Sequence, residues 1–131
     1  TILDQLESLI GQLENTLSVN KKKIYIGGLS MGGMGTFEMV ARNPNKFAAA
    51  FPICGGTNVR FASLMKDTPF WIFHGEADTV VPVTYSKEIY GALKNLDAEV
   101  ELTLYPEAGH DSWNNVFKEP GLMSWVFKHS R

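Results

Sequence analysis

The sequence predicts an α/β fold in which about four parallel strands carry helices on both faces of the sheet. Short apolar segments alternate with longer amphipathic segments along the chain. Strands that alternate with helices pair in parallel through right-handed crossovers. The chain has 131 residues, of which 44% are hydrophobic and 20% charged, and this suits one globular domain over residues 1–131.

The amino-terminal half supplies two helices and two strands. Residues 2–17 carry apolar side chains at helical spacing, which predicts an amphipathic helix. Residues 24–28 form a short apolar run that ends in glycine, as a buried strand does. Residues 31–42 predict a second helix, which Asn43-Pro44 ends. Residues 47–53 predict a second strand.

The carboxyl-terminal half continues the alternation after an irregular connection. Residues 69–74 predict a third strand and residues 85–96 a helix. Residues 100–105 alternate between apolar and polar side chains, which predicts a strand at the edge of the sheet. Residues 112–129 predict a last helix, interrupted near Pro120.

Charge and composition exclude several classes of function. The net charge of −2 offers no basic field for nucleic acid, and no apolar run approaches the length of a membrane span. The single cysteine, Cys54, permits no disulfide within the chain. No histidine or cysteine spacing matches a metal site, and no glycine pattern matches a phosphate cradle, so we expect neither metal nor cofactor. No signal peptide is visible, and the sequence predicts no compartment.

Ser30 stands in the pattern Gly28-Leu29-Ser30-Met31-Gly32, between a predicted strand and a predicted helix. At such a turn the serine takes a strained backbone conformation that pushes its Oγ out at the carboxyl edge of the sheet. We expect glycine to be required at both 28 and 32, because side chains there would clash. The N–H of Met31, at the helix start, can donate to an oxyanion. The alternative is a glycine-rich turn with an idle serine.

A serine nucleophile needs a base and an acid that orients the base. His110 follows the fourth predicted strand and Asp78 follows the third, so both lie at the same sheet edge as Ser30. The chain order Ser30, Asp78, His110 is the order expected of a triad built on such a sheet. We expect His74 to be structural and His129 to be a solvated surface group. Glu76 and Asp111 are weaker candidates for the acid.

At these residues the sequence resembles the carboxyl-terminal part of an α/β-hydrolase, in effect a truncated or minimal form of that fold. Within the superfamily it is similar to the esterase and predicted-peptidase branch, near the phospholipase/carboxylesterase and feruloyl-esterase-like proteins. The similarity covers nearly the whole chain and is carried by residues 24–36, 47–56, 69–82 and 109–113.

The resemblance implies a role for each motif. Ser30 would be the nucleophile, Asp78 the acid, His110 the base, and the Met31 amide one oxyanion donor. The residues that the resemblance implies near the pocket are Leu29, Cys54, Gly55 and Trp113.

The chain departs from the family pattern at its amino-terminal side. Family members have roughly four more strands before the equivalent of residue 1, including a segment that supplies a second oxyanion N–H. Without them, strand 24–28 would have an unpaired apolar edge. We expect a homodimer or higher homo-oligomer that covers this edge or the helix over residues 1–17. The alternatives are a separate amino-terminal chain and an inactive fragment.

The function that this reasoning predicts is a serine esterase that cleaves small, accessible esters through an acyl-enzyme on Ser30. A peptidase or a thioesterase on the same triad is the first alternative, because the loops that read the leaving group are short. A non-catalytic fragment or subunit with vestigial motifs is the second.

Overall fold

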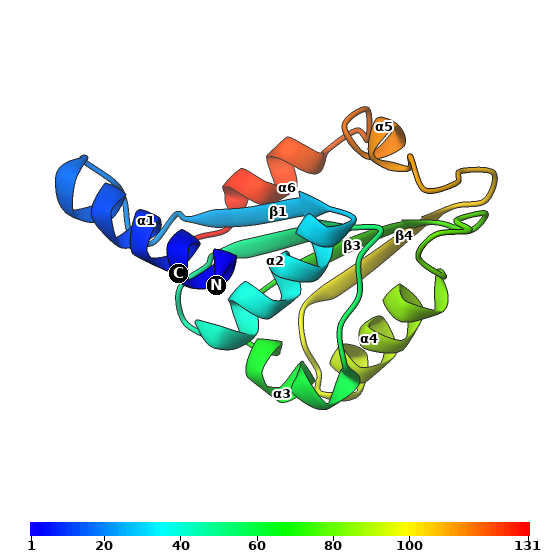
Figure 1. Ribbon diagram of the computed structural model, residues 1–131, viewed down its shortest axis with the longest axis horizontal. Helices are drawn as coiled ribbons and strands as arrows, with labels where there is room; N and C mark the ends of the chain where they lie inside the picture. Colours follow the sequence, from blue (N-terminus) through cyan, green and yellow to red (C-terminus); the bar gives the residue numbers. More distant parts are fainter.

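A single parallel sheet of four strands forms the centre of the molecule. The computed structural model describes all residues, 1–131. The strands are β1 (Tyr25–Leu29), β2 (Ala49–Ile53), β3 (Phe70–Gly75) and β4 (Val100–Tyr105), and they lie in the order β1-β2-β3-β4 (Figure 1). Every neighbouring pair is parallel, so the predicted fold class is confirmed.

Helices cover both faces of this sheet, as the alternation of elements predicts. On one face lie α2 (Met31–Arg42), the short α3 (Ala62–Met65) and α4 (Thr84–Asn95) (Figure 1). The last helical region occupies the other face as two pieces, α5 (Trp113–Val116) and α6 (Leu122–Lys128), with a break that includes Pro120. No helix has the combination of length and apolar character that spanning a membrane requires.

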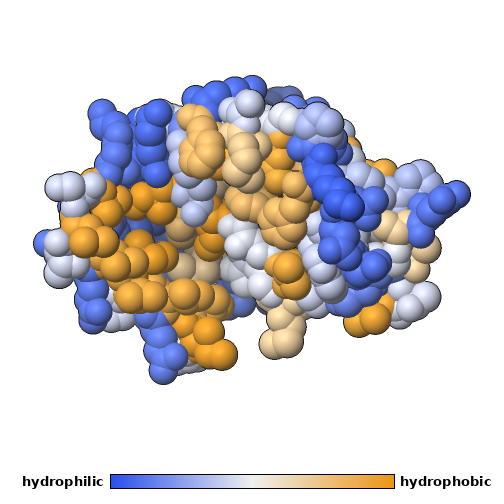
Figure 2. Space-filling model, turned by 90° about the horizontal axis from the view of Figure 1, so that it is seen from above, coloured by the Kyte–Doolittle hydropathy of each residue, from blue (hydrophilic) through white to orange (hydrophobic).

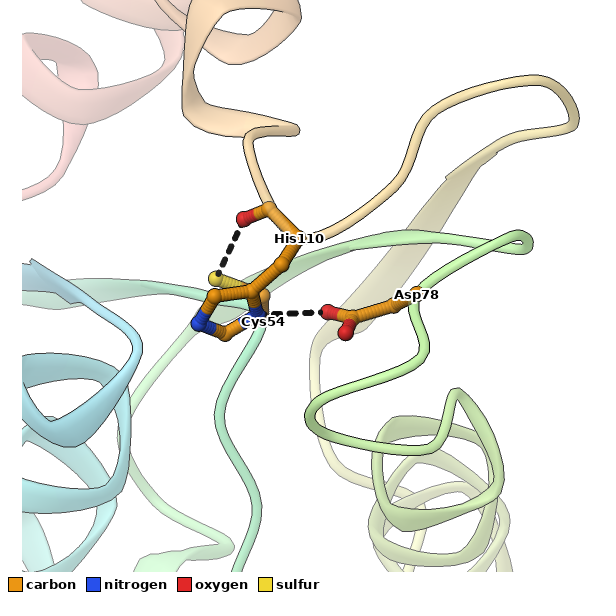
Figure 3. A group of neighbouring side chains, drawn as sticks. All are labelled: Cys54, Asp78 and His110. Atoms are coloured by element: carbon orange, nitrogen blue, oxygen red, sulfur yellow. Dashed lines mark hydrogen bonds and ion pairs between the residues drawn. The ribbon is translucent and has the colours of Figure 1, made fainter.

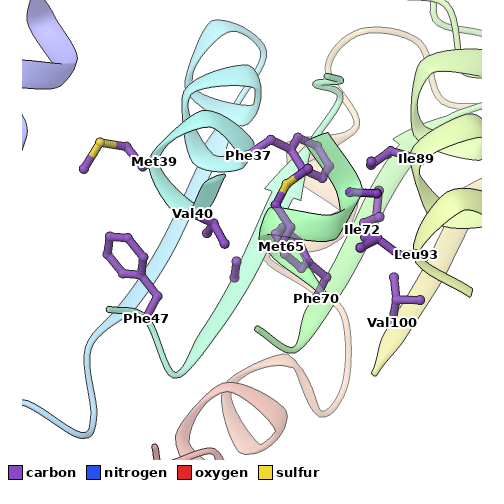
Figure 4. Close-up of a cluster of buried hydrophobic side chains, with 12 residues drawn as sticks. Phe37, Met39, Val40, Phe47, Met65, Phe70, Ile72, Ile89, Leu93 and Val100 are labelled. Carbon is purple, nitrogen blue, oxygen red and sulfur yellow. The ribbon is translucent and has the colours of Figure 1, made fainter. Parts of the chain in front are cut away.

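Two apolar cores flank the sheet. The larger one gathers side chains of α2, β3 and α4 with their neighbours between the sheet and the helices (Figure 4). In it the rings of Phe37 and Phe70 stack with their centroids 5.3 Å apart. The smaller core joins the opposite face of the sheet to α6 through Trp125 and Val126. Both cores hold the carboxyl ends of the strands in fixed relative positions, and those ends carry the site.

The first helix, α1 (Ile2–Thr16), packs only loosely beside β1. It contains no buried residue, although Leu3 and Ile10 touch the larger core. Ion pairs fix it to α2, among them Arg42 Nε with Glu7 Oε1 at 2.8 Å. A capping box at Thr1 and Asp4 begins the helix. The apolar side chains that it leaves exposed are Ile2, Leu6, Leu9 and Leu13.

The outer edge of β1 has no strand beside it. In the parallel ladder, Ile24 accepts from Ala48 and Ser30 donates to Ile53, so the even-numbered residues face β2. The N–H and C=O groups of Tyr25, Gly27 and Leu29 therefore point away from the sheet. Between this edge and α1 runs an apolar groove of about 510 Å³, and hydrophobic residues gather at the α1 end of the molecule (Figure 2).

Candidate active site

Ser30 occupies a sharp turn between β1 and α2. Its backbone has φ 55° and ψ −118°, a region that residues other than glycine seldom adopt. The Ser30 N–H donates to the carbonyl of Ile53 on β2 at 2.9 Å, and the Ser30 carbonyl accepts from Gly33 at 2.9 Å. These bonds fix a strained turn whose side chain projects at the carboxyl edge of the sheet, as the sequence pattern predicts.

The two glycines of the pattern differ in how closely other backbone atoms approach them. A Cβ added at Gly28 would lie 2.3 Å from the carbonyl oxygen of Gly32, so β1 and α2 can cross only with glycine at 28. A Cβ at Gly32 would meet no atom within 4 Å. The prediction that glycine is required at 32 is therefore wrong, because the α-carbon of Gly32 faces open space.

Close packing of α2 on the sheet depends on Gly33 and Gly55 instead. A Cβ at Gly33 would lie 2.6 Å from the carbonyl oxygen of Ile53, and a Cβ at Gly55 would lie 2.5 Å from the carbonyl carbon of Gly33. Gly55 is buried against the helix. Gly55 therefore does not line an open pocket as expected, but packs beneath α2.

The structure brings Ser30, His110 and Asp78 together in a single line of hydrogen bonds. Ser30 Oγ and His110 Nε2 lie 2.8 Å apart, and His110 Nδ1 and Asp78 Oδ2 lie 2.9 Å apart. The Asp78 bond holds the proton of the neutral imidazole on Nδ1, which leaves Nε2 as an acceptor facing the serine hydroxyl. Asp111, which adjoins His110, is exposed and takes no part.

Asp78 is held as a carboxylate by its surroundings. It is only 8% exposed, and its Oδ1 accepts from the N–H groups of Val80 and Val81, each at 2.9 Å. Burial alone would raise the pKa of Asp78, but the hydrogen bond with His110 and those from the backbone outweigh it, and the pKa lies below its ordinary value. The acid is therefore both ionised and fixed in direction.

Of the other two histidines, His74 borders this line, with its Nε2 3.4 Å from Asp78 Oδ2, and His129 lies apart from it. The buried His74 ring contacts Ser86 Oγ at 2.7 Å and the Val81 carbonyl at 2.8 Å, which fits the expected structural role. The prediction that His129 is a solvated surface group is wrong. Its side chain is 11% exposed and its Nε2 lies 2.6 Å from Glu99 Oε2, because α6 packs its end against the start of β4.

Two backbone N–H groups beside the serine are unpaired. The N–H groups of Met31 and Gly32, in the first turn of α2, have no hydrogen-bond partner within the chain. They lie at the positive end of the helix dipole, which favours negative charge there. The Met31 side chain itself is 82% exposed. The turn thus presents two free donors directly after Ser30 in the chain.

The remaining residues expected near the pocket take different positions. Leu29 is 39% exposed beside the serine, and the half-buried Trp113 packs edge-on to the His110 ring at a centroid distance of 5.7 Å. Cys54 is wholly buried. Its Sγ lies beneath the site, 3.6 Å from the carbonyl oxygen of His110 (Figure 3). The expectation that Cys54 lines the pocket is therefore corrected, because the His110 loop covers it.

One cluster of side chains has the donor types of a metal site, and it consists of Cys54, Asp78 and His110. Their candidate ligand atoms all lie within 4.8 Å of one another. Two of the three, His110 Nδ1 and Asp78 Oδ2, already bond to each other (Figure 3). An ion could take this place only by breaking the bond that orients the imidazole.

Sequence reasoning missed two supports of the site. Gly75 ends β3, and a Cβ there would lie 2.3 Å from the carbonyl oxygen of Ala108, so the loop that carries His110 crosses close over it. Gly75 directly follows the predicted strand 69–74, and a glycine at a strand end is a signal for such a close approach. Ser86, on α4, contacts His74 from a distant part of the chain, and no local pattern indicates it.

The model of one protein family matches most of the chain. The phospholipase/carboxylesterase family model covers residues 1–120. The chain belongs to this family. The description of the family names phospholipases and carboxylesterases, which are both ester hydrolases.

Individual relatives support the assignment. Over 91 residues the chain is 34% identical to a bifunctional acetylxylan esterase/xylanase of Neocallimastix patriciarum, covering 69% of this chain and 13% of the relative. It is 31% identical to acyl-protein thioesterase 1 of Neurospora crassa, covering 77% of this chain and 44% of the relative. The chain spans about half or less of the length of these relatives.

A solved structure shows the same arrangement of elements. A thermostable esterase superposes with a TM-score of 0.94 at 36% identity, covering 98% of this chain and 36% of that chain. The similarity extends over nearly all of the elements described above. The chain therefore shares the α/β-hydrolase fold of this esterase.

Proposed function

We propose that the chain is a serine carboxylester hydrolase that cleaves small, accessible esters through an acyl-enzyme on Ser30. The observation that carries the proposal is the continuous line from Ser30 Oγ to His110 Nε2 at 2.8 Å and from His110 Nδ1 to Asp78 Oδ2 at 2.9 Å. A serine hydroxyl is a weak nucleophile until an oriented base accepts its proton.

The first half of the reaction follows from this geometry. Ser30 Oγ attacks the ester carbonyl carbon while His110 Nε2 takes the hydroxyl proton. The carboxylate of Asp78 stabilises the imidazolium that forms. The carbonyl oxygen becomes an oxyanion, and the free Met31 N–H donates to it. His110 then returns the proton to the leaving alcohol, and the acyl group stays on Ser30.

The second half reverses these roles with water. His110 Nε2 accepts a proton from a water molecule as the water oxygen attacks the acyl carbon. The second oxyanion collapses, the carboxylic acid departs, and His110 returns the proton to Ser30 Oγ. Each step uses the same three side chains and needs no cofactor.

The surroundings of Ser30 support small and accessible substrates. Met31 is 82% exposed and Leu29 is 39% exposed, so the side chains next to the serine form an open rim. Trp113, packed edge-on to His110, supplies one apolar wall. A short acyl group can approach the hydroxyl along this rim.

The test is hydrolysis of p-nitrophenyl acetate and p-nitrophenyl butyrate. Wild-type protein should hydrolyse both, and Ser30→Ala should lose at least about 10³-fold in kcat/KM. Ser124→Ala, at an exposed serine on α6, is the matched control and should keep wild-type rates. Equal rates in wild type and Ser30→Ala, or no hydrolysis by wild type, would contradict the proposal.

A thioesterase on the same residues is the second candidate. The similarity to acyl-protein thioesterase 1 favours it, because an acyl-enzyme on Ser30 can form from a thioester as well as from an oxygen ester. A panel of oxygen esters, thioesters and peptide amides with one common acyl group separates the candidates. The substrate with the highest Ser30-dependent kcat/KM identifies the leaving group, and a preference for the amides would indicate a peptidase.

A further inference from the structure

Cys54 has an unusual backbone for a residue at the end of a buried strand. It follows β2 directly and has φ 43°, in the left-handed region that favours glycine. Its N–H donates to the carbonyl of Phe73 at 2.9 Å. Gly55 and Gly56 follow immediately, yet the strained position itself carries a side chain. A contact made by that side chain would explain why glycine does not occupy the position.

The thiol of Cys54 contacts the loop of His110 and lies near the turn of Ser30. Its Sγ lies 3.6 Å from the carbonyl oxygen of His110, in hydrogen-bonding contact (Figure 3). On the other side it lies near the backbone N–H of Ser30, which itself donates to the Ile53 carbonyl, and near the Ser112 hydroxyl, which has no hydrogen-bond partner. One buried atom therefore lies between the serine turn and the histidine loop.

The main chain of His110 has no other hydrogen bond within the protein. Neither its N–H nor its carbonyl pairs with any other backbone or side-chain group. The ring is fixed by Asp78 and Ser30. The loop that carries it is paired at the Ala108 and Asp111 carbonyls, but the only hydrogen bond to the main chain of His110 itself comes from the Cys54 thiol.

The thiol is in the state that this contact requires. Burial raises the pKa of Cys54. The nearby Ser30 N–H and Ser112 hydroxyl lower this pKa, but they offset only part of the increase. The group therefore stays as S–H at neutral pH and can donate to a carbonyl, whereas a thiolate could not. Because Cys54 is wholly buried, it does not compete with Ser30 as a nucleophile.

We propose that Cys54 is a positioning residue, whose S–H group holds the main chain of His110 so that the imidazole stays aligned with Ser30. The proposal rests on the esterase function proposed above. A positioning role affects the rate of the proton transfer, and therefore kcat, more than it affects substrate binding.

Three substitutions at position 54 test the proposal. Cys54→Ser keeps a hydrogen-bond donor, Cys54→Ala removes it, and Cys54→Gly removes it while also relieving the positive φ. We expect Cys54→Ala and Cys54→Gly to lose about five- to tenfold in kcat with KM within about twofold, the effect of losing one modest hydrogen bond. Cys54→Ser should recover at least half of the wild-type kcat, and Cys54→Gly should melt no lower than Cys54→Ala.

The controls separate positioning from stability and from the proposed function. Val126→Ala, in the same core but on α6, should lower the melting temperature and leave kcat unchanged. The comparison of wild type with Ser30→Ala decides the esterase function by itself. With Ser30-dependent activity present, the proposal is overturned if Cys54→Ala and Cys54→Gly keep wild-type kcat. It is overturned equally if Cys54→Ser is as slow as Cys54→Ala.

Discussion

Gly28→Ala tests the crossing of β1 and α2, on which the position of Ser30 depends. The new Cβ would lie 2.3 Å from the carbonyl oxygen of Gly32 and 2.5 Å from its carbonyl carbon. Both atoms belong to the backbone of α2, so no side-chain rotation relieves the contact. Non-bonded carbon atoms rest about 3.5–4.0 Å apart, and the helix must therefore move by about 1 Å.

The cost of that movement can be worked from the packing of α2. The Gly33 α-carbon already lies against the Ile53 carbonyl, so a displaced helix loses this contact as well. Overpacking costs about 1–3 kcal/mol, and we expect about 2–3 kcal/mol because the obstacle is backbone. For 131 residues, with about 2.1 cal/mol/K of unfolding entropy per residue, this lowers Tm by about 7–11 °C. Ser30 Oγ moves with the helix, and kcat should fall about 10–100-fold.

Gly32→Ala is the matched control in the same turn. Its Cβ meets nothing within 4 Å, and alanine favours a helix over glycine by up to about 1 kcal/mol. Thermal melts and p-nitrophenyl acetate hydrolysis of the two variants should differ clearly. If Gly28→Ala melts and turns over like Gly32→Ala, the close crossing is not what fixes the serine turn.

Four further predictions concern charge, pH and assembly. Asp78→Asn should lower kcat about 10³–10⁴-fold in the ester assay, because the imidazole loses its orienting partner; a loss below tenfold would contradict this. The pKa of Asp78 is lower in the folded than in the unfolded protein, so the Asp78 carboxylate stabilises the fold above about pH 4. This stabilisation is lost on acidification. The free energy of unfolding should therefore fall less between pH 5 and 2 for Asp78→Asn than for wild type. The pKa of Cys54 is higher in the folded than in the unfolded protein, so the thiol stabilises the fold below about pH 8.5, and this stabilisation is lost as pH rises. The difference in free energy of unfolding between wild type and Cys54→Ala should therefore narrow toward pH 10. A constant difference would refute this prediction. We also propose that a second copy covers the open edge of β1 and the leucines of α1. Wild type should then sediment as a dimer and Leu9→Lys as a monomer. The control Leu96→Lys, at a similarly exposed leucine that caps the carboxyl end of α4, should sediment as a dimer. A monomeric wild type would contradict that assembly.

The sequence predicts most of the fold because its elements are locally encoded. Every strand begins within two residues of the start that apolar runs and the flanking glycines and prolines predict. The alternation of apolar and polar residues in 100–105 predicts an edge strand, and β4 lies at the edge of the sheet. The meeting of Ser30, Asp78 and His110 also follows from local signals, because parallel strands deliver their carboxyl ends to one edge.

The errors concern contacts that only tertiary packing determines. The pattern treats Gly28 and Gly32 alike, whereas only the first faces a neighbouring backbone. His129 looks terminal and solvated in the sequence, but α6 turns it toward Glu99. The family resemblance implies that Cys54 lies near the pocket, but its side chain is buried beneath the His110 loop.

The central claim is that Ser30 is an activated nucleophile, and covalent labelling tests it most directly. A fluorophosphonate probe should add one equivalent to the folded protein, and peptide mass spectrometry should place the adduct on Ser30. Labelling should disappear in Ser30→Ala and slow by about 10³-fold in Asp78→Asn. Folded wild-type protein that carries no adduct on Ser30, or that is labelled on another residue with Ser30 untouched, would contradict the account.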